Sequence, residues 1–160
     1  MKIGVPRETA AGERRIALVP ESAKKLVEQG NEVVIEKARS ASVDFPDTAY
    51  VAAGARIAAD AGEVLAGSDL VLKIQPPSEA EIASLRTGAV LVAILQPFQN
   101  GDTVRRLAEK SVTSFSLDLL PRITRAQAMD VLSSMSTIAG YKGVLIAAAA
   151  LPKMVPLLMT

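Results

Sequence analysis

The sequence predicts an α/β fold, a doubly wound parallel sheet followed by a long C-terminal helix. Short apolar segments, such as residues 89–95, alternate with segments of helical pattern along the first 125 residues. Strands that are apolar along their whole length are typical of a parallel sheet covered by helices on both faces. Residues 126–150 contain no proline and are rich in alanine, methionine and leucine, which indicates one long helix.

Five strands and five helices are predicted before that long helix. The strands lie at 2–5, 32–36, 70–74, 89–95 and 113–117, and the helices at 20–30, 47–53, 60–66, 78–85 and 102–110. Pro20 and Gly30 stand at the start and the end of the first helix, as the asymmetry of helix ends favours. Ser78 and Glu81 predict a capping box on the fourth helix. We expect a Rossmann or flavodoxin-like sheet, which binds ligands at the carboxyl ends of its strands.

Composition excludes several classes of function. The net charge of the 160 residues is +1, so no excess of positive charge points to nucleic acid. The chain has neither cysteine nor histidine, which excludes disulfides, thiolate or histidine metal sites and Ser-His-Asp triads. The chemistry of an enzyme with this composition must come from a cofactor, or from polar roles of Arg, Lys, Asp and Gln. The apolar stretch 143–160 is broken by Pro152, Lys153 and Pro156, so we expect no direct membrane insertion.

A group of polar residues around the start of the long helix is the main candidate site. Arg122 and Arg125 are donors suited to a pyrophosphate or a carboxamide, and Gln127 and Asp130 can satisfy an amide. Asp130 lies three residues from both Gln127 and Ser133, so these side chains share a helix face. The alternative is a solvated first helical turn in which Asp130 only favours the helix dipole.

Three further segments could line a cleft at the carboxyl ends of the strands. The charged loop 7–15 could hold an anion, or it could be a surface loop that pairs with itself. Lys73 interrupts a buried strand, so it needs a partner or a cleft, unless its amino group reaches solvent past the sheet end. The amides of residues 96–100 could contribute, or this segment could be a simple turn. No Gly-x-Gly-x-x-Gly fingerprint and no Walker-type loop is present.

Several of these segments together resemble the alanine dehydrogenase and transhydrogenase superfamily. MKIGVPRE at 1–8 and GERRIALVPE at 12–21 resemble its opening, and LVLKIQPP at 70–77 resembles its third-strand motif. PRITRAQAMDVLSS at 121–134 and IAGYK at 138–142 are similar to the transhydrogenase branch in particular. The resemblance covers essentially the whole chain.

The resemblance implies an NAD(H)-binding part of the alpha subunit of a proton-translocating NAD(P) transhydrogenase. Such a domain passes a hydride between NAD(H) and NADP(H), coupled to proton movement, and the cofactor expected here is NAD. By matching positions, the residues that surround the nicotinamide are Arg122, Gln127, Asp130 and Ser133. No residue is expected to act as a catalytic acid or base, because hydride transfer requires none.

The resemblance also implies an organisation. Residues 1–125 would form an α/β N-terminal subdomain, and residues 126–160 a long helix and tail that lead to a NAD-binding Rossmann domain beyond this sequence. The implied partners are the NADP(H)-binding and membrane subunits or domains, together with a second copy in a homodimer. The expected location is the cytoplasm, peripheral to the inner membrane. On this interpretation the chain alone is an incomplete enzyme.

Two alternatives stay open. In alanine dehydrogenase, the resemblance places substrate-carboxylate ligands at Arg15 and Lys73 and a catalytic histidine at Gln96. Glutamine cannot exchange a proton near neutral pH, which disfavours amino-acid oxidation. The second alternative is a non-catalytic module that keeps the fold for dimerisation or partner binding.

Overall fold

The computed structural model describes residues 1–37 and 45–153. They fall into two compact units, Met1–Leu119 and a second unit that begins at Leu120. The elements in chain order are β1 (Lys2–Val5), α1 (Pro20–Glu28), β2 (Glu32–Glu36), α2 (Asp47–Ala52), β3 (Arg56–Ala58), α3 (Ala61–Gly67), β4 (Leu70–Leu72), α4 (Glu79–Ser84), β5 (Val90–Ala93), α5 (Gly101–Glu109), β6 (Thr113–Ser116), the 3-10 helices η1 (Leu117–Leu119) and η2 (Thr124–Met129), and α6 (Val131–Ala150).

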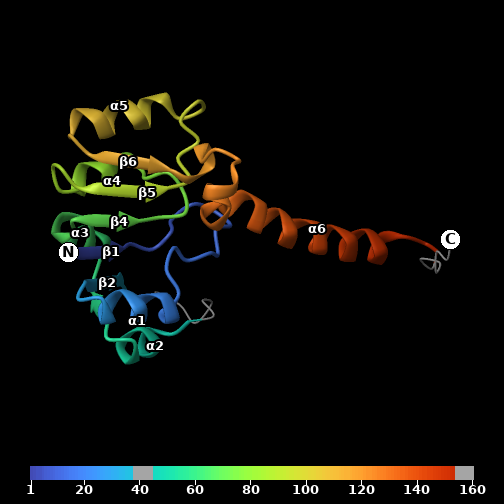
Figure 1. The fold of residues 1–160 in the computed structure, drawn as a ribbon, viewed down its shortest axis with the longest axis horizontal. Coiled ribbons are helices and arrows are strands. Elements are labelled where there is room, and N and C mark those ends of the chain that lie inside the picture. Colours follow the sequence, from blue (N-terminus) through green and yellow to red (C-terminus); the bar gives the residue numbers. More distant parts are fainter. Residues whose placement is uncertain (38–44, 154–160) are drawn as a thin grey trace. The chain divides into compact units, whose positions relative to one another are not determined.

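The first unit is built on one parallel sheet, with the strand order β3-β2-β1-β4-β5-β6 (Figure 1). The winding reverses between β1 and β4, so the predicted doubly wound α/β fold is confirmed. One edge strand, β3, was not predicted. Its three residues, Arg56–Ala58, are too few for a period-two pattern and begin with a charge.

Alternate residues of β2 show that both faces of the sheet are covered. Val33 and Ile35 belong to a core cluster with Ala23 of α1 and Tyr50 of α2. Val34, between them, packs with Val64 of α3 in another cluster. The period of two therefore sends neighbouring side chains into opposite layers, which explains why this strand is apolar throughout. A third cluster unites apolar residues of α3, α4 and α5 with β4 and β5.

β1 and α3 approach closely because Gly4 has no side chain. A Cβ atom there would lie 2.2 Å from the Ser68 hydroxyl oxygen and 2.8 Å from Val64. Ser68 is completely buried and donates to the Val64 carbonyl oxygen at 2.6 Å, so it cannot move without losing that bond. Gly4 thus fixes the distance between the central strand and the helix that crosses to the second face.

The second unit consists of η2 and the 20-residue helix α6. The prediction that a single helix begins at residue 126 was wrong, because residues 124–129 form a 3-10 helix and α6 begins at Val131. Asp130 separates the two with a ψ of 88°, and its carboxylate caps α6 by accepting from the Ser133 backbone N–H. An aspartate that caps a helix ends the preceding turn as well, a local preference that composition alone did not predict.

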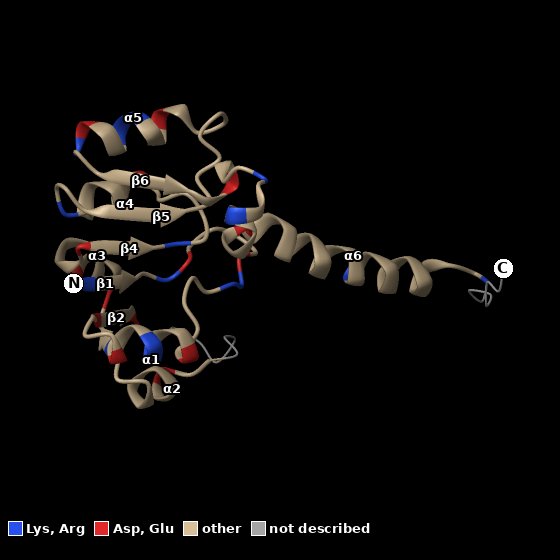
Figure 2. Cartoon of the chain, viewed as in Figure 1, with Lys and Arg blue, Asp and Glu red and all other residues tan. Residues whose placement is uncertain are grey.

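α6 is almost uncharged, with Lys142 as its one charged residue (Figure 2). Its large apolar side chains are exposed, among them Ile138, Tyr141 and Val144. By length and composition α6 is the one helix among the described residues that could cross a membrane. A helix of this kind can also be covered by another protein element, so its composition does not distinguish a membrane from a protein contact.

Candidate functional site

Asp130 and Ser133 are in direct contact at the start of α6. The Ser133 hydroxyl donates to Asp130 Oδ2 at 2.6 Å, and the Ser133 backbone N–H donates to Oδ1 at 3.0 Å. The hydroxyl and backbone donors of Ser133, with a smaller contribution from the charge of Arg122, hold the pKa of Asp130 below its ordinary value. The result is a fixed carboxylate at the positive end of a helix.

Gln127 and Arg122 complete the predicted set without direct contact to that pair. The Gln127 carbonyl oxygen accepts from the Asp130 backbone N–H at 3.2 Å, which places Gln127 one turn before Asp130. The side chains of Gln127 and Arg122 are exposed and make no hydrogen bond within residues 1–37 and 45–153. The four residues therefore offer one oriented carboxylate and hydroxyl, one amide and one cation within a short segment.

Lys73 lies at the carboxyl end of β4 in a buried charged cluster. Its Nζ atom is 2.7 Å from Glu81 Oε1 and 3.5 Å from Glu8 Oε2, and the three side chains are 1%, 8% and 4% exposed. Glu8 also accepts from the backbone N–H groups of Ile74 at 2.6 Å and Gln75 at 3.2 Å. Lys73 is thus paired inside the protein and does not extend to solvent.

A second charged group adjoins the first through Gln75. Glu13 accepts from Arg15 Nε at 2.8 Å and Arg15 Nη2 at 2.5 Å, and Gln75 Nε2 donates to Glu13 at 2.7 Å. The Arg15 side-chain bond, against the opposing effect of burial and with help from Gln75, lowers the pKa of Glu13 from 4.5 to about 2. The loop after β1 therefore pairs with itself, which was the alternative to an anion cradle.

The ends of β5 and β6 are braced by Asp118 and Ser116. The Ser116 hydroxyl donates to Asp118 Oδ1 at 2.5 Å, and the Gln96 backbone N–H donates to the same oxygen at 3.4 Å. Burial opposes ionisation of Asp118, but these donors outweigh it and lower its pKa. Gln96 has a φ of 47°, unusual for a residue other than glycine, and its side chain is exposed. The turn after β5 is therefore held in one conformation.

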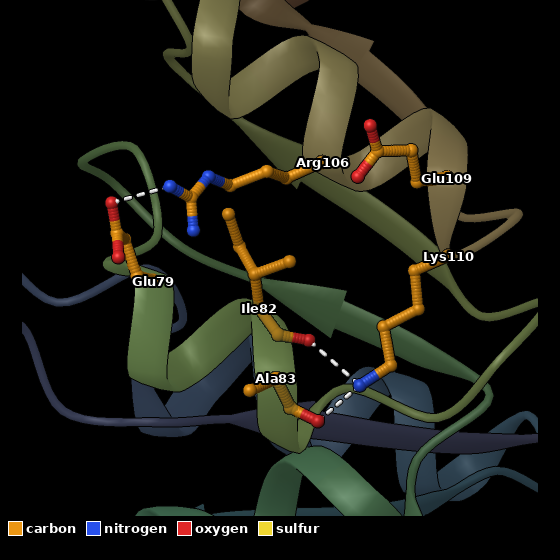
Figure 3. A pocket seen from close by; sticks show the side chains of 6 residues that line it. All are labelled: Glu79, Ile82, Ala83, Arg106, Glu109 and Lys110. Atoms are coloured by element: carbon orange, nitrogen blue, oxygen red, sulfur yellow. Dashed lines mark hydrogen bonds and ion pairs between the residues drawn. The ribbon is translucent and has the colours of Figure 1, made fainter.

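A hollow of about 310 Å³ between α4 and α5 does not offer comparable chemistry. Arg106 pairs with Glu79 at 2.9 Å, and Lys110 donates to the Ile82 carbonyl oxygen at 2.9 Å and to that of Ala83 (Figure 3). These cations are already engaged in joining the two helices. Lys110 satisfies carbonyl groups at the end of α4 that its own helix leaves without donors.

Sequence reasoning missed the partners of Lys73. A lysine in an apolar strand indicated that a carboxylate was needed, but nothing in the spacing identified Glu8, 65 positions earlier, as one of them. The loop that carries Glu8 and the end of β4 meet because β1 and β4 are neighbours in the sheet. Among the described residues, no group of three or more acidic, histidine or cysteine side chains could hold a metal ion.

Comparison with known proteins gives a consistent result. Residues 4–139 match the family described as "Alanine dehydrogenase/PNT, N-terminal domain". The whole chain is 41% identical to the first of the polypeptides that make up the NAD(P) transhydrogenase alpha subunit of Rhodospirillum rubrum, and it covers 43% of that polypeptide. A solved transhydrogenase from Sinorhizobium meliloti matches the whole chain with a TM-score of 0.91 and 39% identity, over 48% of its own chain. Alanine dehydrogenase of Halomonas elongata is 32% identical over 96% of this chain and 41% of its own length.

These matches have two consequences. Identity is higher to the transhydrogenase relative than to the alanine dehydrogenase, although both share the fold. The chain spans less than half the length of these relatives, so it corresponds to only a portion of each of them.

Proposed function

The chain belongs to the alanine dehydrogenase/PNT N-terminal domain family, and from this premise we propose that it is a portion of the NAD(H)-binding component of an NAD(P) transhydrogenase. The reaction is hydride transfer between NAD(H) and NADP(H), coupled to proton translocation by partner subunits. The observation that carries the proposal is the identity of 41% over the full chain to a transhydrogenase alpha subunit. The dihydronicotinamide ring would supply the hydride, so this chain has to bind and orient rather than exchange protons.

The segment that contains Arg122, Gln127, Asp130 and Ser133 is proposed to hold the nicotinamide. The exposed Gln127 amide has a donor and an acceptor to offer to a carboxamide. Asp130 and Ser133 lock each other in place, which supplies a preorganised acceptor and hydroxyl beside it. Arg122 adds a cation suited to a phosphate oxygen or to a carbonyl group. This mixture of polar groups fits the nicotinamide carboxamide, which needs both donors and acceptors.

The partners proposed are the NADP(H)-binding and membrane subunits of the enzyme and a second copy of the chain. The support for protein partners is α6, whose exposed apolar residues need a cover in water. The proposed location is the cytoplasmic side of the inner membrane, reached through those subunits. We also propose that residues 126–160 lead toward a NAD-binding Rossmann domain, as the greater length of the relatives allows.

NADH titration tests the proposed activity. The chain would be titrated alone and joined to the segment that follows the matched region in the Rhodospirillum rubrum relative. We expect NADH binding to the joined protein and little binding to the chain alone, because a glycine-rich phosphate loop is absent from this sequence. A joined protein that is folded and fails to bind NADH would refute the proposal. Binding of NADPH in preference to NADH would refute the choice of cofactor.

A further inference from the structure

The reversal of winding between β1 and β4 is the place where an open α/β sheet offers a crevice for ligands. The loops that follow these two strands contain Arg15 and Lys73, the two cations at this switch point. A pair of cations in such a place would suit the carboxylate of a small substrate. The question is whether either cation is available.

Both cations already hold carboxylates of the chain itself. The three carboxylates, called here the internal glutamates, are Glu8, Glu13 and Glu81. Lys73 is almost fully buried between two of them, so its amino group has no open side. Displacing either glutamate would leave a buried carboxylate without its cation, which is costly.

Arg15 is more open, at 36% exposure, but its geometry is unfavourable for a second carboxylate. Glu13 occupies Nε and Nη2, the edge that forms two parallel hydrogen bonds. An incoming carboxylate would approach the remaining Nη1 group beside the charge of Glu13. The three internal glutamates exceed the two cations by one formal charge, so the network repels a further anion.

We propose that the internal glutamates act as built-in ligands of the two switch-point cations and exclude small carboxylate substrates, such as amino acids and 2-oxo acids. Glu13 is the determinant that can be tested most directly, because its pair with Arg15 lies nearest to solvent. At neutral pH Glu13 stays ionised, since its pKa is about 2, and the exclusion is therefore permanent under ordinary conditions. The network lies wholly in the first unit and is independent of the proposed nicotinamide site.

The test is a titration with pyruvate, followed by the backbone amide NMR signals of Arg15, Ile74 and Gln75 in the full chain. Wild-type protein should show no saturable shift. Glu13→Gln removes the competing charge, and we expect pyruvate affinity to rise by about tenfold to a hundredfold, into the millimolar range. Adding Arg15→Gln to that variant should abolish the gain. Glu21→Gln is the matched control, because Glu21 forms an exposed pair with Lys25 on α1 and its loss should change nothing.

Saturable binding of pyruvate to the wild-type protein would overturn the proposal. A folded Glu13→Gln variant without any gain in affinity would overturn it as well. If that variant does not fold, Glu13→Asp serves instead, because a carboxylate shorter by one methylene cannot reach both Arg15 and Gln75. We expect a smaller gain with Glu13→Asp, and its absence in a folded protein again contradicts the proposal.

Discussion

Lys73→Met is the substitution that the charge network makes most informative. Methionine keeps the length and the apolar stem of the side chain and removes only its charge. Two carboxylates, Glu8 and Glu81, then lose the ammonium group that lies 3.5 and 2.7 Å from them, in a place where all three side chains are less than a tenth exposed. Removal of one partner from a buried ion pair costs about 3 to 5 kcal/mol of unfolding free energy.

The assay is urea unfolding followed by circular dichroism, with Lys24→Met as the matched control. Lys24 lies 3.9 Å from Glu28, and its side chain is 63% exposed, so the same change there should cost within about 0.5 kcal/mol. Adding Glu81→Gln to Lys73→Met should recover about 1 to 2 kcal/mol, because one uncompensated charge is removed. A loss below about 1 kcal/mol for Lys73→Met would refute the view that buried charges hold these loops together.

Three further substitutions test other regions of the molecule. Glu13→Gln should flatten the pH dependence of stability between 4.5 and about 2: the depressed pKa makes this stability present above 4.5 and lost as the pH falls toward 2, and an unchanged acid-unfolding profile would contradict it. Ser78→Ala should lower the unfolding free energy by about 1 kcal/mol, because it removes one side of the capping box of α4; no change in the urea midpoint would contradict the cap. Gly4→Ala should cost about 1 to 3 kcal/mol, since the new methyl group meets the Ser68 hydroxyl. Gly140→Ala, in an open helical position, should instead stabilise α6 by about 0.5 to 1 kcal/mol, and equal thermal shifts for the two glycine variants would refute the packing argument.

Most of the fold could be predicted because its strands are buried on both faces. Apolar runs such as Val33–Ile35 left no doubt about a covered parallel sheet, and the Ser78–Glu81 pair predicted a helix start that the structure confirms. β3 was missed because a three-residue edge strand has no periodicity to detect. The start of α6 was misplaced because the capping role of Asp130 depends on local hydrogen bonds rather than on composition.

The candidate site was predictable only to a limited extent. The polarity of the segment from Arg122 to Ser133 was evident from the sequence, and the contact between Asp130 and Ser133 follows from a spacing of three residues. The role of that segment came from family resemblance, and it stays a prediction. The fate of Lys73 could not be derived, because its partners depend on which strands are neighbours in the sheet.

The central claim is that the segment around Asp130 orients the nicotinamide, and the affinity of Gln127→Ala for NADH tests it most directly. Gln127 is exposed, and its side chain makes no hydrogen bond within the portion of the chain that the structure describes, so the fold should tolerate the change. In the protein extended to the length of its transhydrogenase relatives, we expect NADH to bind about tenfold more weakly to Gln127→Ala. Gln99→Ala, another exposed glutamine in the turn after β5, should bind NADH as the wild type does. Equal NADH affinities for the wild type and Gln127→Ala would contradict the claim.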